Sequence, residues 1–353
     1  MESYSVLGIM SGTSLDGVDL ALCHFENNSE GWSFRISHAE TIAYSDEWKK
    51  RLLSLPVSSA EIFVQTDAML GKLFGEMVKN FCTKNKLNPD YISSHGHTIF
   101  HQPGAGFTSQ IGNGAMIAAT CGYPVVCDFR TLDVALGGQG APLVPIGDQM
   151  LFSDYDYCLN LGGIANISSN ESVKRVAFDI CGCNQVLNSL ANRVHKAYDA
   201  GGEMAAKGKI RKELLERLNS LPYYSQPFPK SLGREDMESD IFPMMDKPGI
   251  PLEDLLATFC EHIAIQISNY VKPGKMLVSG GGAFNTFLIE RLRHHSLAEI
   301  VVPDPMIINF KEALIFAFLG VLRWTNKANS LSSVTGARHN HSGGVIWLPG
   351  VSK

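Results

Sequence analysis

Three short glycine-bearing turns, each directly after a short apolar segment, constrain the fold of this chain more than any other feature. They are Gly12-Thr13-Ser14, Gly162-Gly163 and Gly280-Gly281-Gly282. A single glycine turn after a strand usually only reverses the chain. Exposed backbone N–H groups beside small residues also form anion-binding concavities, to which hydroxyl groups add donors. The third turn opens a helix, whose N-terminus attracts negative charge. Together the three turns predict a phosphate or nucleotide site.

The first turn lies in a predicted β-hairpin near the N-terminus. Two strand-like runs, residues 5–12 and 18–25, flank it. Asp16-Gly17 is a dipeptide typical of tight turns, and we assign the reversal of the chain to it. The stretch lacks the lysine that closes a G-x-x-x-x-G-K-[ST] phosphate loop. This motif alone therefore leaves both interpretations open, a simple hairpin and a phosphate loop.

Strand-like and helical segments alternate along the rest of the chain. Residues 58–85 carry apolar side chains at helical spacing behind the candidate N-caps Ser58 and Ser59. A second capped helix is predicted behind Asn285, after the third glycine turn. Further helices are predicted at 114–121 and near 185–197, 203–219 and 251–271. This alternation predicts an α/β fold.

The length of 353 residues predicts two lobes, since a single core of this size is uncommon. The glycine-rich joint Gly137-Gly138-Gln139-Gly140 is the predicted boundary, because glycine loops are where chains change direction. Lobe I then spans residues 1–138 and lobe II residues 139–353, with a C-terminal end that can return to lobe I. The proline-rich segment 221–249 is predicted to run over the surface.

Composition limits the classes of partner. A net charge of −5 gives no support for nucleic-acid binding, which usually needs a basic domain. The apolar run Glu312–Leu322 is too short to span a membrane, and the N-terminus does not read as a secretory signal. The eight cysteines include no C-x-x-C pair, so a zinc ribbon is not expected. We expect a reduced, cytoplasmic protein that binds neither nucleic acid nor membrane.

Eight short segments in order along the chain carry a resemblance to a known family. They are GIMSGTSLDGVD, HGHTIFHQP, DFRTLDVALGGQGAPLVP, NLGGIANIS, PKSLGRE, SGGGAFN, EALIFAFLG and TGAR, and they extend from residue 7 to about 340. In these segments the chain resembles the anhydro-N-acetylmuramic acid kinase family. The resemblance implies an actin-like ATPase, or ribonuclease H-like, fold of two lobes with ATP in the cleft between them.

The resemblance also implies a reaction. ATP phosphorylates O6 of 1,6-anhydro-N-acetylmuramic acid while water opens the anhydro bridge, which gives N-acetylmuramic acid 6-phosphate for cell-wall sugar recycling. Such a reaction needs a base, Mg²⁺ and backbone donors around the phosphates. The resemblance to this family also implies a homodimer. The residues implied to bind the nucleotide are Gly12, Thr13, Ser14, Leu15, Asp16, Gly17, Val18, Asp19, Gly162, Gly163, Gly280, Gly281 and Gly282.

Two acidic residues are the implied catalytic groups. Asp179 matches the aspartate of the family's F-D-T-G-P-G-N motif and is expected at the end of the apolar strand 173–178 as the base. Its ordinary alternative is a helix cap or turn. Glu312 matches a family glutamate near the substrate, and its alternative is a first-turn acid that favours the helix dipole.

The sugar and metal contacts are assigned in the same way. The resemblance places His97, where the family usually has glutamine, and Arg130 at the sugar. A salt bridge to Asp128 or Asp133 is the alternative for Arg130. Asp19 could steer Mg²⁺ through water. Met10 stands where many relatives of the superfold carry an aspartate, so the protein ligands of the metal stay unknown.

The sequence departs from the family pattern in the segment Asp179–Asn184, which reads DICGCN where the family has D-T-G-P-G-N. The later family aspartate is Asn188. Three functions therefore stay open: the family kinase, a kinase of a different amino sugar, and a non-catalytic sensor of anhydro-sugar or nucleotide. A C-x-C metal or redox site at Cys181 and Cys183, and a zinc site at His95 and His97, are further alternatives with weaker signals.

Overall fold

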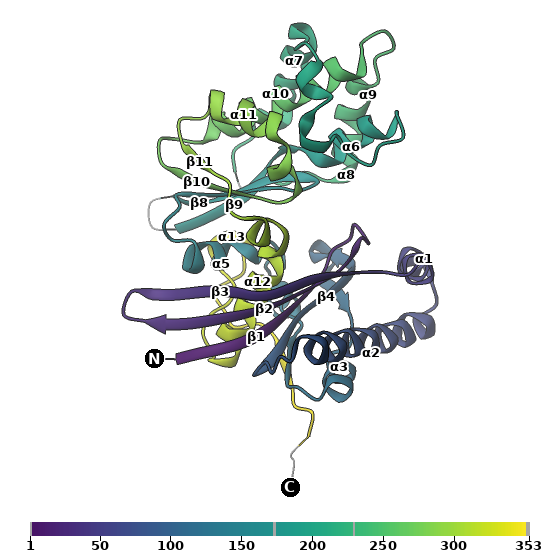
Figure 1. Cartoon of the computed structure of the whole chain (residues 1–353), viewed down its shortest axis with the longest axis vertical. Coiled ribbons are helices and arrows are strands. Elements are labelled where there is room, and N and C mark those ends of the chain that lie inside the picture. The colour runs from purple at the N-terminus through teal and green to yellow at the C-terminus, as the bar shows by residue number, and fades with distance from the viewer. Residues whose placement is uncertain (1, 172–173, 229, 351–353) are drawn as a thin grey trace. The chain divides into compact units, whose positions relative to one another are not determined.

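The computed structural model describes residues 2–171, 174–228 and 230–350. Val173 and Pro229, which belong to segments named above, lie outside the described residues. The chain forms two compact units, the first made of residues 1–151 and 310–353 and the second of residues 152–309. Figure 1 shows both units along the chain.

The first unit is built on one mixed sheet of seven strands. Their order is β12-β6-β4-β1-β2-β3, and β5 pairs with the end of β4. The strands β1, β2 and β3 are antiparallel, whereas β4 runs parallel to β1 and β6 parallel to β4. The strands are β1 Glu2–Ser11, β2 Gly17–Asn28, β3 Gly31–Ala43, β4 Tyr91–Gln102, β5 Phe107–Ile111, β6 Val125–Cys127 and β12 Val345–Trp347.

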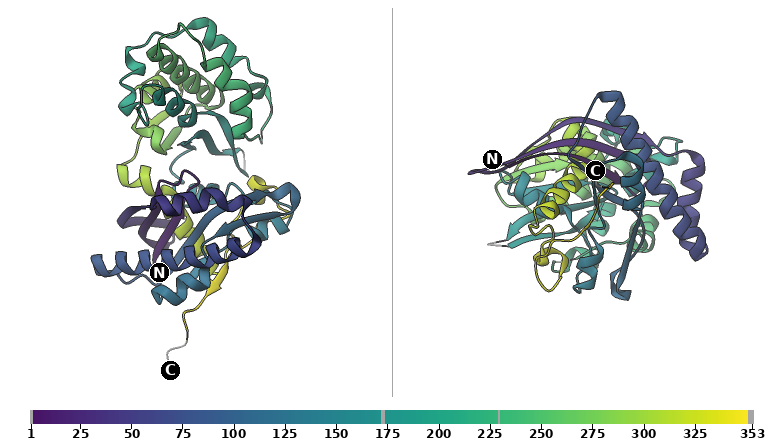
Figure 2. Two further views of the ribbon diagram at one scale, coloured as in Figure 1. Left: turned by 90° about the vertical axis from the view of Figure 1, so that its right-hand side faces the viewer. Right: turned by 90° about the horizontal axis from the view of Figure 1, so that it is seen from below.

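Helices cover both faces of this sheet (Figures 1 and 2). Leu7 and Ile9 of β1 belong to the core beneath α2 and α3, while Gly8 lies so close to α12 that a Cβ would meet the carbonyl of Ala313. Both faces of β1 are therefore buried, which explains its continuous apolar run. The helices are α1 Asp46–Ser54, η1 Leu55–Val57, α2 Ala60–Asn85, η2 Pro103–Ala105, α3 Gly114–Cys121, α4 Thr131–Ala135, α5 Val144–Leu151, α13 Ser332–Thr335 and α12 Pro305–Trp324, which belongs to this unit from residue 310 onward.

The second unit is built on a sheet of five strands in the order β11-β10-β7-β8-β9. The long helix α10 packs on it beside α7 and α11 (Figure 1). The strands are β7 Tyr157–Leu161, β8 Ile164–Glu171, β9 Lys174–Gly182, β10 Lys275–Ser279 and β11 Glu299–Val301. The helices are α6 Asn184–Asn192, η3 Ala200–Gly202, η4 Ala205–Lys207, α7 Lys212–Asn219, η5 Pro222–Ser225, α8 Arg234–Asp236, η6 Met237–Ile241, α9 Phe242–Met245, α10 Leu252–Tyr270, η7 Gly281–Phe284 and α11 Thr286–His295.

The two sheets have the same topology. In the second unit β7, β8 and β9 are antiparallel, β10 runs parallel to β7, and β11 runs parallel to β10. Strands β3-β2-β1-β4-β6 of the first unit follow the same order and directions. This duplicated order is that of the ribonuclease H-like fold, and it confirms the predicted α/β class.

The first hairpin turns earlier than predicted. Leu15 has a left-handed conformation, with φ 61°, and its N–H donates to the carbonyl of Gly12 at 3.3 Å. Gly17 is already the first residue of β2. The reversal therefore occurs over residues 12–15 and not at Asp16-Gly17, because the pairing of β2 with β3 takes Gly17 into the sheet.

The boundary between the compact units lies after Leu151, whereas the sequence prediction placed it after Gly138. Residues 310–353 belong to the first unit. Two buried carboxylates account for this arrangement. Asp148 of α5 pairs with Lys311 of α12 at 2.7 Å, and Asp133 accepts a hydrogen bond from the N–H of Gly140 in the predicted joint.

Among the described residues, one helix is long and apolar enough to cross a membrane by length and composition, namely α12. It contains the predicted run Glu312–Leu322 and is longer than that run. Residues 313–319 and 321–322 are almost completely inaccessible to solvent. Such burial is typical of the core helix of a globular unit. All eight cysteines are free thiols.

Candidate active site

The turn between β1 and β2 presents free backbone donors. Thr13 and Ser14 are exposed at the tip of the hairpin, and Gly12 is half-buried. Within the described part of the chain, the N–H groups of these three residues donate to no protein acceptor. The geometry agrees with an anion-binding concavity, since successive unpaired N–H groups and two hydroxyls lie together.

Three segments of the second unit meet around its own glycine turns. The carbonyl of Gly163 accepts hydrogen bonds from the N–H groups of Cys183 and Gln185 at 2.9 and 3.1 Å. A Cβ on Gly282 would lie 2.6 Å from that of Leu161, so the turn Gly280–Gly282 packs beside the turn Gly162-Gly163. In the described residues, the N–H groups of both glycine turns have no protein acceptor. The predicted glycine turns of this unit therefore form one cluster.

Asp179 lies within β9, whereas the sequence suggested a position at the end of the apolar strand. Strand β9 continues to Gly182, and a register shift against β8 leaves Ile180 without a partner. Such a bulge changes the direction of a neighbouring side chain and is common beside active sites. The strand continues because its next residues are apolar and buried.

Three hydrogen bonds hold Asp179. Its Oδ2 accepts from the N–H of Leu232 at 3.0 Å, and its backbone N–H donates to the carbonyl of Lys230 at 3.2 Å. The Tyr223 hydroxyl donates to the Asp179 carbonyl at 2.6 Å. Burial raises the pKa of the Asp179 carboxyl, and the hydrogen bond from Leu232 partly offsets this shift. A carboxylate with a raised pKa is a better proton acceptor.

Arg130 is held by a different set of contacts from those the sequence suggested. Its Nε donates to Nε2 of His95 at 3.0 Å and its Nη1 to the carbonyl of Gly140 at 2.7 Å. These contacts replace the salt bridge proposed to Asp128 or Asp133. Burial lowers the pKa of the guanidinium to about 10, which leaves it charged at neutral pH.

His95 and His97 do not converge. Gly96 between them is left-handed, with φ 77°, and the pairing of β4 with β1 shifts register there. His95 binds Arg130, whereas Nδ1 of His97 shares a 2.9 Å hydrogen bond with the Ser11 hydroxyl. Among the described residues no cluster of three or more His, Cys, Asp or Glu side chains could hold a metal ion. The geometry does not support zinc at this strand.

His97 is buried in a polar network. Its partner Ser11 also bonds the hydroxyl of Tyr44 at 2.7 Å. Burial lowers the pKa of His97 to about 4, so the ring is neutral at physiological pH. In the described part of the chain its Nε2 makes no hydrogen bond to protein, and this nitrogen is therefore available to a ligand.

Glu312 is electrostatically coupled to both Arg130 and Asp19. The Oδ1 atom of Asp19 accepts a 2.6 Å hydrogen bond from Thr41, and burial, together with nearby Asp16, raises its pKa. Glu312 is accessible to solvent, yet dense surrounding protein raises its pKa; Arg130 opposes this shift and Asp19 adds to it. The first unit thus gathers two carboxylates and one guanidinium.

The Cys181 and Cys183 thiols are fully buried. Burial raises the pKa of Cys183 to about 12 and that of Cys181 well above its ordinary value. Metal binding and thiol exchange both require a thiolate. The structure therefore gives no support for a C-x-C metal or redox site.

Sequence reasoning missed several residues that position the site. Asp133 is fully buried and accepts hydrogen bonds from Gly140 N–H, Ser330 Oγ and Thr335 Oγ1 at 2.7 to 2.8 Å. It thereby fixes the carbonyl that binds Arg130. An acidic residue four positions before the glycine-rich joint was the available signal. Tyr223 and Leu232 were missed because the segment 221–249 was predicted to run over the surface, and no role was assigned to these two residues.

The chain matches known proteins over almost its whole length. The model of the family described as anhydro-N-acetylmuramic acid kinase matches residues 4–349. The proteins of that name from Saccharophagus degradans and Methylobacterium nodulans are each 36% identical, over 376 and 379 residues. These alignments cover 99% and 97% of this chain and 100% and 99% of the relatives. The relative of the same name from Aliivibrio fischeri is 37% identical over 98% of this chain and 99% of its own length. The chain therefore belongs to the anhydro-N-acetylmuramic acid kinase family.

Proposed function

We propose that this protein is an ATP-dependent kinase that opens 1,6-anhydro-N-acetylmuramic acid and phosphorylates O6. The relatives that it matches over nearly their whole length are named anhydro-N-acetylmuramic acid kinases. The observation that carries the proposal is the partly buried Asp179, in the unit whose glycine turns present free N–H groups. One hydrogen bond holds its carboxylate and two hold its backbone. A base of this kind and phosphate-binding amides are the two requirements that the reaction places on the protein.

The proposed reaction joins hydrolysis of the anhydro bridge to phosphoryl transfer. Asp179 accepts a proton from water, whose oxygen forms a bond to C1 of the sugar. The C1–O6 bond breaks, and O6 takes the γ-phosphoryl group of ATP, which releases ADP. Backbone N–H groups of residues 12–14, 162–163 and 280–282 would hold the phosphates. Arg130 and the free Nε2 of His97 would bind the sugar, and Glu312 would act beside it.

Mg²⁺ is the metal that such a phosphoryl transfer needs. The described residues hold no dedicated cluster of metal ligands, and this agrees with an ion that keeps several waters and binds through one carboxylate and the phosphates. Asp19 would hold its hydration shell, since its carboxylate is half-buried and coupled to Glu312. When bound, the ion neutralises charge on the phosphates.

The altered segment Asp179–Asn184 favours testing two further candidates, a kinase of another amino sugar and a non-catalytic sensor. A coupled assay of ADP release with Mg²⁺-ATP, run with and without the anhydro-sugar, separates them. We expect ADP release only with the anhydro-sugar, and a phosphorylated product by mass spectrometry. Turnover with N-acetylglucosamine alone would support the second candidate. Thermal stabilisation by the ligands without ADP release would support the sensor.

We also propose a homodimer in the cytoplasm, as the family likeness implies. Support for an interface comes from exposed apolar side chains in successive elements α1, η1 and α2, among them Leu53, Val57 and Val64. Exposed apolar side chains that gather into one patch commonly mark an association surface. Light scattering on the purified chain measures its mass directly, and a monomer at micromolar concentration would contradict this part.

A further inference from the structure

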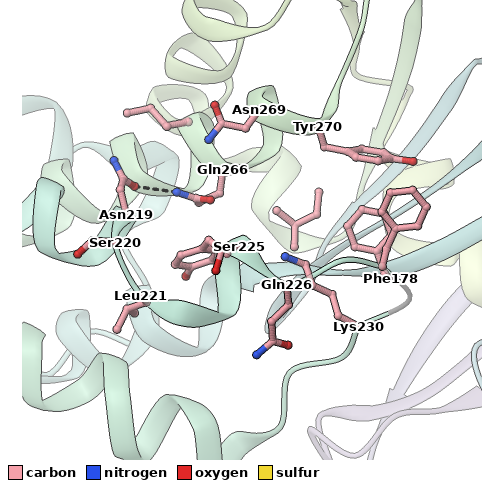
Figure 3. A pocket seen from close by; sticks show the side chains of 14 residues that line it. Phe178, Asn219, Ser220, Leu221, Ser225, Gln226, Lys230, Gln266, Asn269 and Tyr270 are labelled. Atoms are coloured by element: carbon pink, nitrogen blue, oxygen red, sulfur yellow. Dashed lines mark hydrogen bonds between the residues drawn. The ribbon is translucent and has the colours of Figure 1, made fainter.

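A pocket of about 540 Å³ lies in the second unit between β9, α10 and the segment around η5. Its volume falls in the range of small-molecule sites. Figure 3 shows the amides of Asn219 and Gln266 on one side and the rings of Phe178 and Tyr270 on the other. Phe178 and Ile180 line the pocket, whereas Asp179 between them binds Leu232 instead. The pocket is therefore separate from the Asp179 carboxylate.

The aromatic side of the pocket is a preformed stack. The rings of Phe178 and Phe228 are parallel to within 10°, with centroids 5.3 Å apart, and Tyr270 lies edge-on to Phe178 at 4.8 Å. Phe228 is 42% exposed although it is stacked. An exposed, rigid aromatic face is suited to the apolar C–H face of a pyranose ring.

The opposite side offers paired donors and acceptors. Asn219 Oδ1 accepts hydrogen bonds from Gln266 at 2.9 Å and from His262 at 2.6 Å. In the described part of the chain this leaves Asn219 Nδ2, Gln266 Oε1 and the exposed amide of Asn269 without protein partners. Amides present a donor and an acceptor together, which matches hydroxyl and acetamido groups.

One charged side chain, Lys230, lines the pocket, and no carboxylate is among its described lining residues. Its Nζ donates to the Tyr223 carbonyl at 3.1 Å and lies 4.5 Å from the centre of the Tyr223 ring. A single ammonium group favours a ligand with one negative charge over a cation.

The wall of the pocket also holds Asp179. We call residues 221–228 and 230–232 the strap. Leu221, Phe228 and Lys230 of the strap line the pocket. Tyr223, Lys230 and Leu232 of the same strap make the three hydrogen bonds to Asp179. A ligand that orders the strap would therefore change the freedom of the Asp179 carboxylate.

We propose that this pocket binds an N-acetylated hexosamine, preferably one that carries a carboxylate, and that the strap couples its occupancy to Asp179. Binding is independent of the proposed function, whereas the coupling rests on it. The ring stacks on Phe228, the acetamido and hydroxyl groups bond the amides, and the carboxylate pairs with Lys230.

Isothermal titration calorimetry with N-acetylglucosamine and N-acetylmuramic acid tests the binding. Phe228→Ala and Asn269→Leu should each weaken binding about tenfold or more, equivalent to 1.4 kcal/mol. Phe107→Ala is the matched control, since Phe107 is 43% exposed in the first unit, and it should leave binding unchanged. Lys230→Met should weaken the binding of N-acetylmuramic acid and leave the binding of N-acetylglucosamine unchanged. Arg130→Met should leave the binding of both sugars unchanged. Loss of binding in this variant would place the sugar at the site proposed for Arg130 and His97, and would overturn the proposal.

The coupling has its own readout. A bound hexosamine should shift the acid limb of the pH profile of ADP release, and Tyr223→Phe should abolish this shift while calorimetric binding persists. If the protein has no kinase activity, the calorimetry still measures sugar binding to the pocket. The proposed function and the proposed pocket can therefore be disproved separately. No binding of either sugar at millimolar concentration, or equal binding by wild type and Phe228→Ala, would overturn the site.

Discussion

The two units share one strand order but carry different chemistry on it. Each sheet begins with a hairpin whose turn contains glycine, followed by a parallel strand on the other side of the first strand. In the first unit the turn offers the hydroxyls of Thr13 and Ser14, and the nearby charges are Asp19, Arg130 and Glu312. In the second unit the turn is only Gly162-Gly163.

The carboxylates also occupy different strands of the shared frame. Asp19 lies on the second strand of its sheet, opposite Met10, whereas Asp179 lies on the third strand of its sheet beside a bulge. Strand order therefore repeats without repeating the site. The lesson is that a fold provides positions at turns and strand ends, and the residues at those positions determine the chemistry.

The largest effect is expected from matched substitutions of these two aspartates. Asp179→Asn should lower kcat/KM by about 10³-fold, since removal of a general base costs 10²–10⁴. Asp19→Asn should lower it only about tenfold, the cost of an outer-sphere metal contact. Steady-state kinetics of ADP release measures both. Equal losses would contradict the different roles assigned to the two units.

The same pair has a stability signature. Burial raises the pKa of both carboxyls. A carboxyl whose pKa is higher in the folded state stabilises the fold at low pH, and this contribution is lost as pH rises through the folded pKa. Both asparagine variants should therefore melt higher than wild type at pH 7. A lower melting temperature for Asp179→Asn would show that its hydrogen bonds outweigh its desolvation.

An intermediate effect is expected from alanine at one glycine of each unit. Gly280 has φ 79°, and a Cβ there would lie 2.4 Å from Asn160 Oδ1 and 2.9 Å from the Leu161 backbone. Gly280→Ala should cost about 2–4 kcal/mol in the second unit. At Gly12 the nearest atom is Ser14 Oγ at 3.7 Å, so Gly12→Ala should change stability by less than about 1 kcal/mol. Differential scanning calorimetry compares the two, and equal destabilisation would mean that both turns are equally tight.

The smallest effect at neutral pH is that of two buried histidines, which affect stability only in acid. Burial lowers the pKa of His97 to about 4 and that of His262 in the second unit to about 3. A neutral buried histidine contributes stability above its unfolded pKa of about 6.5, and this is lost as pH falls toward the folded value, to a limit of about 3 kcal/mol for His97. His97→Gln should reduce the loss of unfolding free energy that the first unit suffers in acid, and should leave the loss in the second unit unchanged. Urea unfolding at pH 7 and near pH 4 measures this, and an unchanged pH dependence would contradict it.

Local signals predicted the elements that depend on neighbours in the sequence. The Ser59 hydroxyl caps α2 and Asn285 caps α11, as their positions before apolar helical patterns indicated. Helix α3 covers the predicted residues 114–121. Capping needs only residues within one turn of helix, so sequence suffices.

Predictions that depended on distant residues were less accurate. Asp179 was expected at a strand end, but the pairing of β9 with β8 extends the strand to Gly182. The spacing of His95 and His97 left a shared metal site open as an alternative, but Gly96 and the register shift separate the two side chains. Strand ends and bulges are set by the partner strand, which no local pattern records.

The sequence by itself determined the α/β class, the glycine turns as ligand-binding candidates and the family to which the chain belongs. These depend on residue type and spacing, which are local properties. Only the tertiary structure decided which groups meet: the glycine turns of the second unit with residues 183–185, the strap with Asp179, and Asp133 with the loop that holds Arg130. Such contacts join residues far apart in the chain, and only the packing of the buried core brings them within hydrogen-bonding distance.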